Sequence, residues 1–310
     1  MAPTSVATYD LGAPRGTGGR WRSDLSVSRI GSTLNAVDER LAYVETKAPL
    51  VFDHIDFTVV DPVRVARLLA APLEYAQRVE SVVVGLGIET LIPRSDERVS
   101  RFLEVWTVDE VGHGRALAEL MRQLGLDSAP ESEPSIPIHN HLVGAVARMS
   151  RPMHEVAEAV WATAGAMNEH LAMTAYARID EILRELNEHA LHETLFRILR
   201  AHESAHKSFY AAYATETMGR MQRWQRRLVR LVVQHTYMPV GAGSKHDRPA
   251  FARTVDALVG ERWDERIANP IQRIAERLLN DGGEMDPFVR RAVVKCLMTS
   301  PTGVLSASSP

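Results

Sequence analysis

The amino-acid sequence predicts an all-α protein, and three observations lead to this prediction. Apolar residues recur at spacings of three and four from Pro62 onward, which is the pattern of a helix with one buried face. The sequence contains no convincing series of strands, no glycine-rich phosphate loop and no repeat of fixed period. The chain of 310 residues is 45% hydrophobic, so it is long enough to bury one large core or two modest ones.

Helix-terminating residues divide the chain into long segments. Gly125 is expected to end one helix as a C-cap, and the proline-containing connection over residues 126–140 is expected to be irregular. The C-terminal third is again helical, with breaks at Pro270 and at the glycine pair 282–283. Four long helices are predicted, over residues 62–91, 96–124, 153–185 and 190–235.

Composition excludes several classes of protein. A formal net charge of -3 argues against a general nucleic-acid partner. The single cysteine, Cys296, cannot form a disulfide within the chain, which favours a reducing compartment. The N-terminus lacks a signal-peptide pattern, and the most apolar stretch, residues 81–88, is too short to cross a membrane. We therefore expect a cytoplasmic protein without a transmembrane segment.

Two Glu-x-x-His motifs carry the chemistry of the sequence: Glu110-Val-Gly-His113 and Glu203-Ser-Ala-His206. Each lies inside a predicted helix, where a spacing of three places both side chains on one face. One such motif alone is weak evidence, because glutamate and histidine are common on solvated helix faces. Ferritin-like proteins with a di-metal carboxylate site combine two such motifs with one glutamate from each of two further helices.

Candidates for the two single glutamates occur in the right order. Glu80 lies on the apolar face of the first predicted helix, and Glu169 lies on an apolar stripe of the third. A buried carboxylate needs a partner, and a metal pair is one. Glu74 and Glu89 compete with Glu80, but Glu74 is out of register in height and Glu89 is too near the turn.

Residue counting supports this assignment. Residue 95 lies midway between Glu80 and Glu110, in the turn between two predicted helices, and residue 186 lies midway between Glu169 and Glu203. Residues equidistant from the turn of an antiparallel hairpin lie at the same height. Each of two hairpins therefore places its two glutamates at one level, and the 126–140 connection becomes the long crossover of a ferritin-like bundle.

The fold prediction is thus a ferritin-like four-helix bundle core with additional C-terminal helices. We expect residues 1–35 to form a flexible N-terminal tail and residues 36–240 to form the di-metal bundle. Residues 241–310 are expected to form a C-terminal helical extension packed on the bundle.

Four carboxylates and two imidazoles make an oxygen-rich site that suits iron or manganese. We expect two iron ions, with manganese as the alternative, because oxygen activation is the usual task of such sites. Catalysis is assigned to Glu110, Glu169 and Glu203. Metal binding is assigned to Glu80, Glu110, His113, Glu169, Glu203 and His206.

Several neighbouring residues leave two interpretations open. Asp109 either supports a ligand histidine across the bundle or is a surface acid. His202 is a polar neighbour of the site, a support for a ligand or an extra ligand. Trp106 lies either on an electron route or in the structural core. A basic segment either docks an acidic carrier protein or an anionic surface, or is an ordinary solvated face; its arginines are Arg220, Arg223, Arg226, Arg227 and Arg230.

The chain resembles the soluble acyl-carrier-protein desaturases over roughly residues 65–240. The segment Trp106-Thr-Val-Asp-Glu-Val-Gly-His-Gly114 resembles the first Glu-x-x-His motif of that family, and residues 203–210 resemble the second. Residues 234–239 resemble the Met-Pro element that follows. The sequence departs from the family at His202, where an aspartate is usual, and at Ala172, where a threonine is usual.

This resemblance implies an oxygen-dependent di-iron oxidase that abstracts hydrogen from an acyl chain. The expected substrate is an acyl-carrier protein or acyl-CoA thioester, the expected electron donor is of the ferredoxin type, and a homodimer is expected. Related di-iron N-oxygenases and hydroxylases of small molecules share the same ligands, so they remain an alternative. A metal-binding protein without oxidase activity is a third interpretation.

Overall fold

The computed structural model describes residues 33–83, 96–127, 150–245, 247–279 and 285–298. The elements in these ranges are helices, and no strand occurs among them, so the prediction of an all-α fold is confirmed. None of the helices in the described ranges is both long and apolar enough to cross a membrane.

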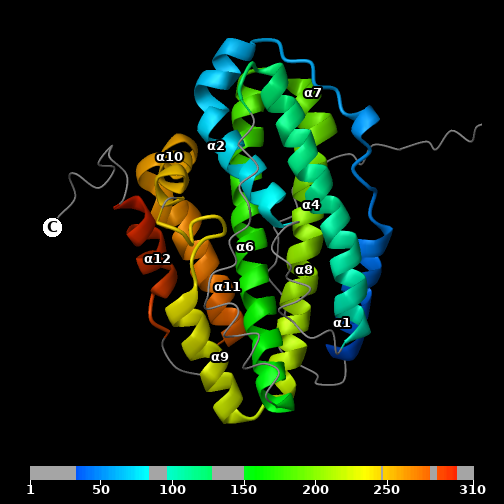
Figure 1. Cartoon of the computed structure of the whole chain (residues 1–310), viewed down its shortest axis with the longest axis vertical. Helices are drawn as coiled ribbons and strands as arrows, with labels where there is room; N and C mark the ends of the chain where they lie inside the picture. The colour runs from blue at the N-terminus through cyan, green and yellow to red at the C-terminus, as the bar shows by residue number, and fades with distance from the viewer. Residues whose placement is uncertain (1–32, 84–95, 128–149, 246, 280–284, 299–310) are drawn as a thin grey trace, which may run out of the picture. The chain divides into compact units, whose positions relative to one another are not determined.

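Four long helices form the centre of the fold (Figure 1). Helix α2 packs along α4, and α6 packs along α8, so that each predicted hairpin pair lies side by side. Interior residues come from the apolar stripes that the sequence pattern indicated, such as Leu69 and Leu73 on α2. The bounds of the four helices are Pro62–Val83 for α2, Glu97–Gln123 for α4, Arg151–Glu185 for α6 and Arg197–Arg220 for α8.

Local sequence explains where these helices begin and end. Asp96 caps α4 because its side chain accepts a hydrogen bond from the Arg98 backbone N–H. Gly125 follows α4 with φ +68°, a left-handed conformation that glycine adopts without strain, as predicted. Pro152 lies in the first turn of α6, where a missing N–H costs nothing.

The prediction of one helix over residues 190–235 was wrong. The chain forms α7 (His189–Leu191), a π-helical turn (His192–Phe196), α8, and then a separate helix α9 (Arg223–Thr236). The break falls at Met221, which is extended and buried. Gln222 and Gln225 then form a reciprocal capping box that starts α9 in a new direction. The hydrophobic period of the sequence continues across this break and concealed it.

Helix α1 (Thr33–Thr46) was not predicted from the sequence. It packs on α8 and α4 through Val37, Leu41 and Val44, which are at most 1% exposed. It begins at Thr33, two residues before the expected end of the N-terminal tail, whose residues 1–32 lie outside the described residues. A short 3-10 turn, Phe52–His54, follows it and leads towards α2.

The C-terminal helices lie together on one side of α6 (Figure 1). Helix α10 packs on α2, and α9 and α11 pack on α6. Their bounds are Arg248–Val259 for α10, Asn269–Leu279 for α11 and Phe288–Leu297 for α12, with short turns at Gly260–Arg262 and Asp264–Ala268. Four other predicted features fall wholly or largely outside the described residues: the end of the first helix after residue 83, most of the 126–140 connection, the glycine pair 282–283, and the last residues of the chain.

Candidate metal centre

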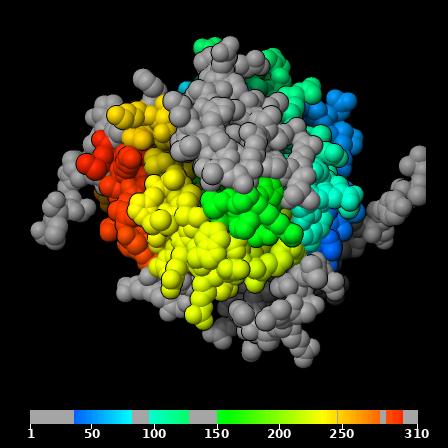
Figure 2. All heavy atoms as spheres, turned by 60° about the horizontal axis from the view of Figure 1, so that its bottom comes forward, coloured from blue at the N-terminus to red at the C-terminus, as the bar shows by residue number. Residues whose placement is uncertain are grey.

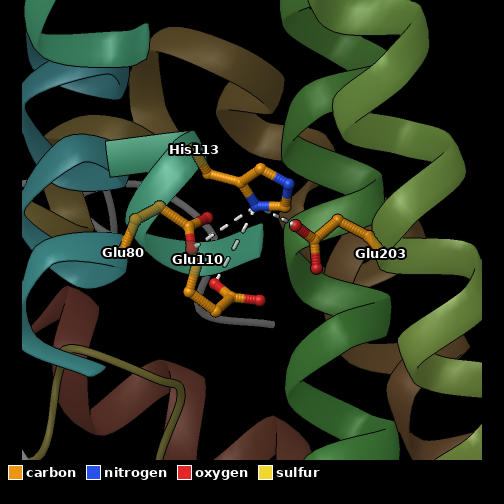
Figure 3. Close-up of side chains that lie close together, drawn as sticks. All are labelled: Glu80, Glu110, His113 and Glu203. Carbon is orange, nitrogen blue, oxygen red and sulfur yellow. Dashed lines mark ion pairs between the residues drawn. The ribbon is translucent and has the colours of Figure 1, made fainter. Parts of the chain in front are cut away.

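Six buried side chains from α2, α4, α6 and α8 converge in the space between these four helices. Helices α2 and α6 each supply one glutamate. Helices α4 and α8 each supply a glutamate and the histidine three residues after it. Figure 3 shows four of them pointing towards one another. The residues are those predicted, and none is more than 8% exposed: Glu80, Glu110, His113, Glu169, Glu203 and His206.

The six residues form two overlapping groups whose ligand atoms lie within 4.8 Å of one another. The first group contains Glu80 and His113, and the second contains Glu169 and His206. Glu110 and Glu203 belong to both groups. The arrangement therefore has two positions, each with its own glutamate and histidine, and two glutamates shared between them. Such a cluster can hold a metal ion.

Polar atoms that face the centre lack hydrogen-bond partners. These atoms are Oε1 of Glu110, Oε1 of Glu203, and Nδ1 of both His113 and His206. His113 Nδ1 lies 3.1 Å from Glu203 Oε1, and His206 Nδ1 lies 3.3 Å from Glu110 Oε1. Buried polar atoms are normally satisfied, so four unsatisfied atoms aimed at one place indicate a missing partner.

Burial and neighbouring charges shift the pKa values of several side chains at the site. Burial, and then the neighbouring Glu80 charge, raise the pKa of Glu110 well above its usual value. Burial and the Glu169 charge do the same to the pKa of Glu203. Burial lowers the pKa of His113 well below its usual value. The protein alone therefore favours neutral side chains here, and a cation would favour the ionised carboxylates and the neutral imidazole that bind it.

The two glutamates that belong to only one ligand group, Glu80 and Glu169, are oriented by uncharged hydrogen-bond donors. The Tyr176 hydroxyl donates a hydrogen bond to Oε1 of Glu80. The indole Nε1–H of Trp106 donates to Oε1 of Glu169 at 3.1 Å. Trp106 is thus buried against a predicted ligand. Tyr176 was not predicted to touch the site, because nothing in its spacing distinguishes it from other apolar-face residues of α6.

Asp109 supports His206 across the bundle, as one of its two sequence interpretations proposed. His206 Nε2 donates to Asp109 Oδ2 at 2.8 Å, and Lys47 Nζ contacts the same oxygen. Burial works against ionisation of Asp109, but the hydrogen bond from His206 and the Lys47 ammonium lower its pKa to about 2. Lys47 was missed by sequence analysis, because it lies 62 residues from Asp109 just after the unpredicted α1.

His202 supports the other histidine. His202 Nδ1 lies 3.1 Å from His113 Nε2, and His202 Nε2 lies 2.8 Å from the Ala48 carbonyl oxygen. His202 is therefore not a member of either ligand group. It is a support for a ligand, which was one of the interpretations left open.

The competing candidates do not join the cluster. Glu74 is exposed on α2, and Glu89 lies outside the described residues. His192 forms an ion pair with Asp180 away from the six residues. Among the described acids and histidines outside the two ligand groups, Asp109 and His202 contact ligand histidines directly.

A mostly apolar cavity of about 60 Å³ adjoins the cluster. It lies between α2, α6 and α10, and Glu80 and Tyr176 form part of its lining. Ala172 and Leu171 contribute from α6, and Phe251 contributes from α10. A small apolar group held in this cavity would lie next to the Glu80 side of the site.

The basic segment lies on the face shown in Figure 2, where α9 is drawn in yellow beside the start of α6 in green. Arg223 and Arg227 on α9 are exposed, as is Arg220 at the end of α8. Arg220 also pairs with Glu216 at 2.7 Å. The cluster of arginines is thus divided between two helices that meet at Met221.

Comparisons with family models, with curated proteins and with solved structures found no match to this chain. The functional argument therefore depends on the geometry of the site and on the motifs of the sequence.

Proposed function

We propose that the six-residue cluster binds two metal ions as a carboxylate-bridged centre. The observation that carries this proposal is the convergence of four buried, unpartnered ligand atoms, two oxygens and two nitrogens, on one place. In the proposed centre, Glu80 and His113 would hold one ion, and Glu169 and His206 would hold the other. Glu110 and Glu203 would bind both. A ferritin-like bundle is the architecture that this ligand order favours.

The donor set favours iron, with manganese as the alternative. Carboxylates and imidazoles are hard to borderline ligands, and no thiolate is among the six. Cys296 is buried in the core cluster formed largely by the C-terminal helices, which does not include the six ligands. A site of this composition suits ions that activate dioxygen.

We further propose that the protein is an oxygen-dependent oxidase of acyl chains, similar to the soluble acyl-carrier-protein desaturases. The motifs around Trp106 and Glu203 support this, as does the cavity beside Glu80. An engineered cavity of about 150 Å³ accommodates benzene, so the smaller cavity here, of about 60 Å³, has no room for an aromatic ring and would hold only a short part of an acyl chain. Ala172, where the family usually has a threonine, lines that cavity and would leave its wall apolar.

Desaturation forms one carbon–carbon double bond and breaks two C–H bonds of the chain. Dioxygen accepts the two hydrogens, together with two electrons and two protons from outside, and leaves as two water molecules. Bound iron would supply the oxidising power for this reaction. The side chains of the protein orient the ligands: Tyr176 fixes Glu80, Trp106 fixes Glu169, and Asp109 fixes His206. The apolar cavity wall would exclude water from the chain.

Electrons would come from a ferredoxin-type donor, because the sequence has no flavin or nicotinamide motif. The acyl group would arrive on an acidic carrier protein, or as its CoA thioester. Arg223 and Arg227, both exposed, are suited to receive an acidic carrier. Such docking would weaken with salt, since exposed charges are screened beyond about 8 Å at physiological ionic strength.

The test incubates iron-loaded protein, ferredoxin, reductase and oxygen with acyl-carrier protein, and separately with an arylamine. Mass loss of two hydrogens from the acyl chain is the expected result. The variant Arg223→Glu/Arg227→Glu should raise KM for the carrier substrate several-fold. Arg40→Glu, which changes an exposed arginine on α1, is the matched control and should leave KM unchanged.

Two results would contradict the acyl-chain proposal. Oxygen gained on the nitrogen of the arylamine, with the acyl chain untouched, would favour an N-oxygenase. No product from either substrate, with metal bound, would favour a metal-binding protein without oxidase activity.

A further inference from the structure

The proposed metal centre has two similar halves, in which residues of α4 and residues of α8 occupy corresponding positions. In each half, the residue just before the shared glutamate supports the histidine of the other half. Asp109 precedes Glu110 and supports His206 on α8. His202 precedes Glu203 and supports His113 on α4. The positions correspond, but the chemistry of the two supporting side chains differs.

On the α8 side, the support is an ionised carboxylate. Asp109 accepts the Nε2–H of His206 at 2.8 Å, which leaves the Nδ1 of His206 without a proton and facing the centre. A carboxylate acceptor makes the imidazole a more basic ligand. Lys47 contacts the same carboxylate and keeps it charged inside the bundle.

On the α4 side, the support is a neutral ring. The Ala48 carbonyl can only accept, so Nε2 of His202 carries the proton and donates it to that oxygen at 2.8 Å. Nδ1 of His202 is then the acceptor for the Nε2–H of His113 at 3.1 Å. Asp109 Oδ1 lies 3.4 Å from the same His202 nitrogen, so the hydrogen-bond partner of His113 is the His202 ring and not the carboxylate.

The other ligands of the two halves are matched. Glu80 accepts one hydrogen bond from a neutral phenol, and Glu169 accepts one from a neutral indole. Glu110 and Glu203 are shared by both ligand groups. The histidine supports are therefore the main chemical difference between the two positions.

We infer that the two metal positions bind with unequal affinity, the position at His206 filling first and releasing its ion last. This inference rests on the proposed metal centre and concerns the order in which its two positions fill. Changes in such outer hydrogen-bond partners typically alter metal affinity by roughly 10–100-fold, so the two dissociation constants should differ by about tenfold or more. A centre with two unequal positions is occupied by a single ion over a range of metal concentrations. A centre with two equal positions holds a single ion to a smaller degree.

The inference is tested by titrating metal-free full-length protein with Mn²⁺ and following the bound ion by electron paramagnetic resonance. One equivalent should give the spectrum of an isolated ion, and a second should give that of a coupled pair. A coupled pair already at substoichiometric metal, or two equal constants, would overturn the inference and leave the proposed centre intact. Failure to bind any Mn²⁺ or Fe²⁺ would overturn the proposed centre itself.

Variants identify which position is the tighter one. His113→Ala should remove the weaker constant and keep the tighter, whereas His206→Ala should do the reverse. Loss of the tighter constant in His113→Ala would overturn the inference. His202→Asp places a carboxylate at the position that matches Asp109, so it should bring the two constants together. Asp109→Asn should weaken the tighter site, and circular dichroism of each variant checks that it folds.

Discussion

Two of the regions that bury acidic side chains treat the negative charge in different ways. Asp180 on α6 is completely buried, yet basic side chains lie around it. Arg200 lies 2.7 Å from one of its oxygens, His192 contacts the other, and Arg184 lies 3.9 Å away. The protein itself therefore supplies the counter-charge at Asp180.

The four buried glutamates of the candidate centre lack such partners. Within the described part of the chain, the ion-pair contacts of Glu80, Glu110 and Glu203 are made with histidines, and the nearest histidine nitrogens have no hydrogen-bond partner. An acid neutralised by arginine is a structural ion pair. Acids that converge with imidazoles, and with no arginine or lysine, can hold an external cation. The difference shows that the partners of a buried acid, and not its burial, distinguish the candidate ligands from Asp180.

The largest expected effect breaks the centre directly. Glu110→Ala/Glu203→Ala removes both shared glutamates, so metal content should fall from about two ions per chain to none. Elemental analysis after gel filtration measures this. If the double variant kept the metal content of the wild type, the ligand assignment would be wrong.

Metal removal should have the next largest effect. An ion that binds only the folded state at a hundred times its dissociation constant stabilises that state by about 2.7 kcal/mol, and two ions by about twice that. Chelation should therefore lower the melting temperature by about 8 °C for a chain of 310 residues. His113→Ala should show a smaller metal-dependent gain. A metal-free protein that melts at the temperature of the loaded one would contradict the prediction.

Replacing the ion-paired acid should separate stability from metal binding. Asp180→Asn weakens hydrogen bonds to charged partners and should lower the free energy of unfolding by about 2 kcal/mol. Its metal content should stay at two ions per chain, because Asp180 belongs to neither ligand group. Chemical denaturation measures the first quantity and elemental analysis the second. Loss of metal in this variant would show that the two regions are not independent.

The smallest expected effect is a pH dependence of the metal-free protein. The pKa values of Glu110 and Glu203 are raised in the folded state, so the folded state binds more protons than the unfolded state above the ordinary value of 4.5. Stability from these groups is therefore present at low pH and is lost as pH rises through the raised pKa values. The lowered pKa of His113 acts in the opposite sense below 6.5.

The Glu110→Gln variant isolates the contribution of the Glu110 carboxyl group to this pH dependence, since the glutamine side chain cannot ionise. The melting temperature of the metal-free variant should fall less steeply with rising pH than that of the metal-free wild type. Equal slopes for the two proteins would show that the raised pKa of Glu110 has no influence on stability. Added metal should reverse the wild-type slope, because it favours the ionised carboxylates.

The sequence by itself determined the class of the fold and which six residues converge. A spacing of three on a helix fixes the relative direction of Glu110 and His113 without any knowledge of the rest of the fold. Equal distances from a turn likewise fix the heights of paired residues in an antiparallel hairpin. Both rules are local, so they could be applied to a single sequence.

Only the tertiary structure decided what surrounds the ligands. Lys47 and Ala48 reach Asp109 and His202 because α1 packs on α4 and α8, and no spacing in the sequence connects residues 62 or 154 positions apart. The break at Met221 was hidden for a related reason, since apolar periodicity reports a buried face and not the direction of the helix axis. Whether a buried acid meets an arginine, as Asp180 does, or three other carboxylates depends on which helices become neighbours. That choice follows from packing of the whole core, which local patterns do not encode.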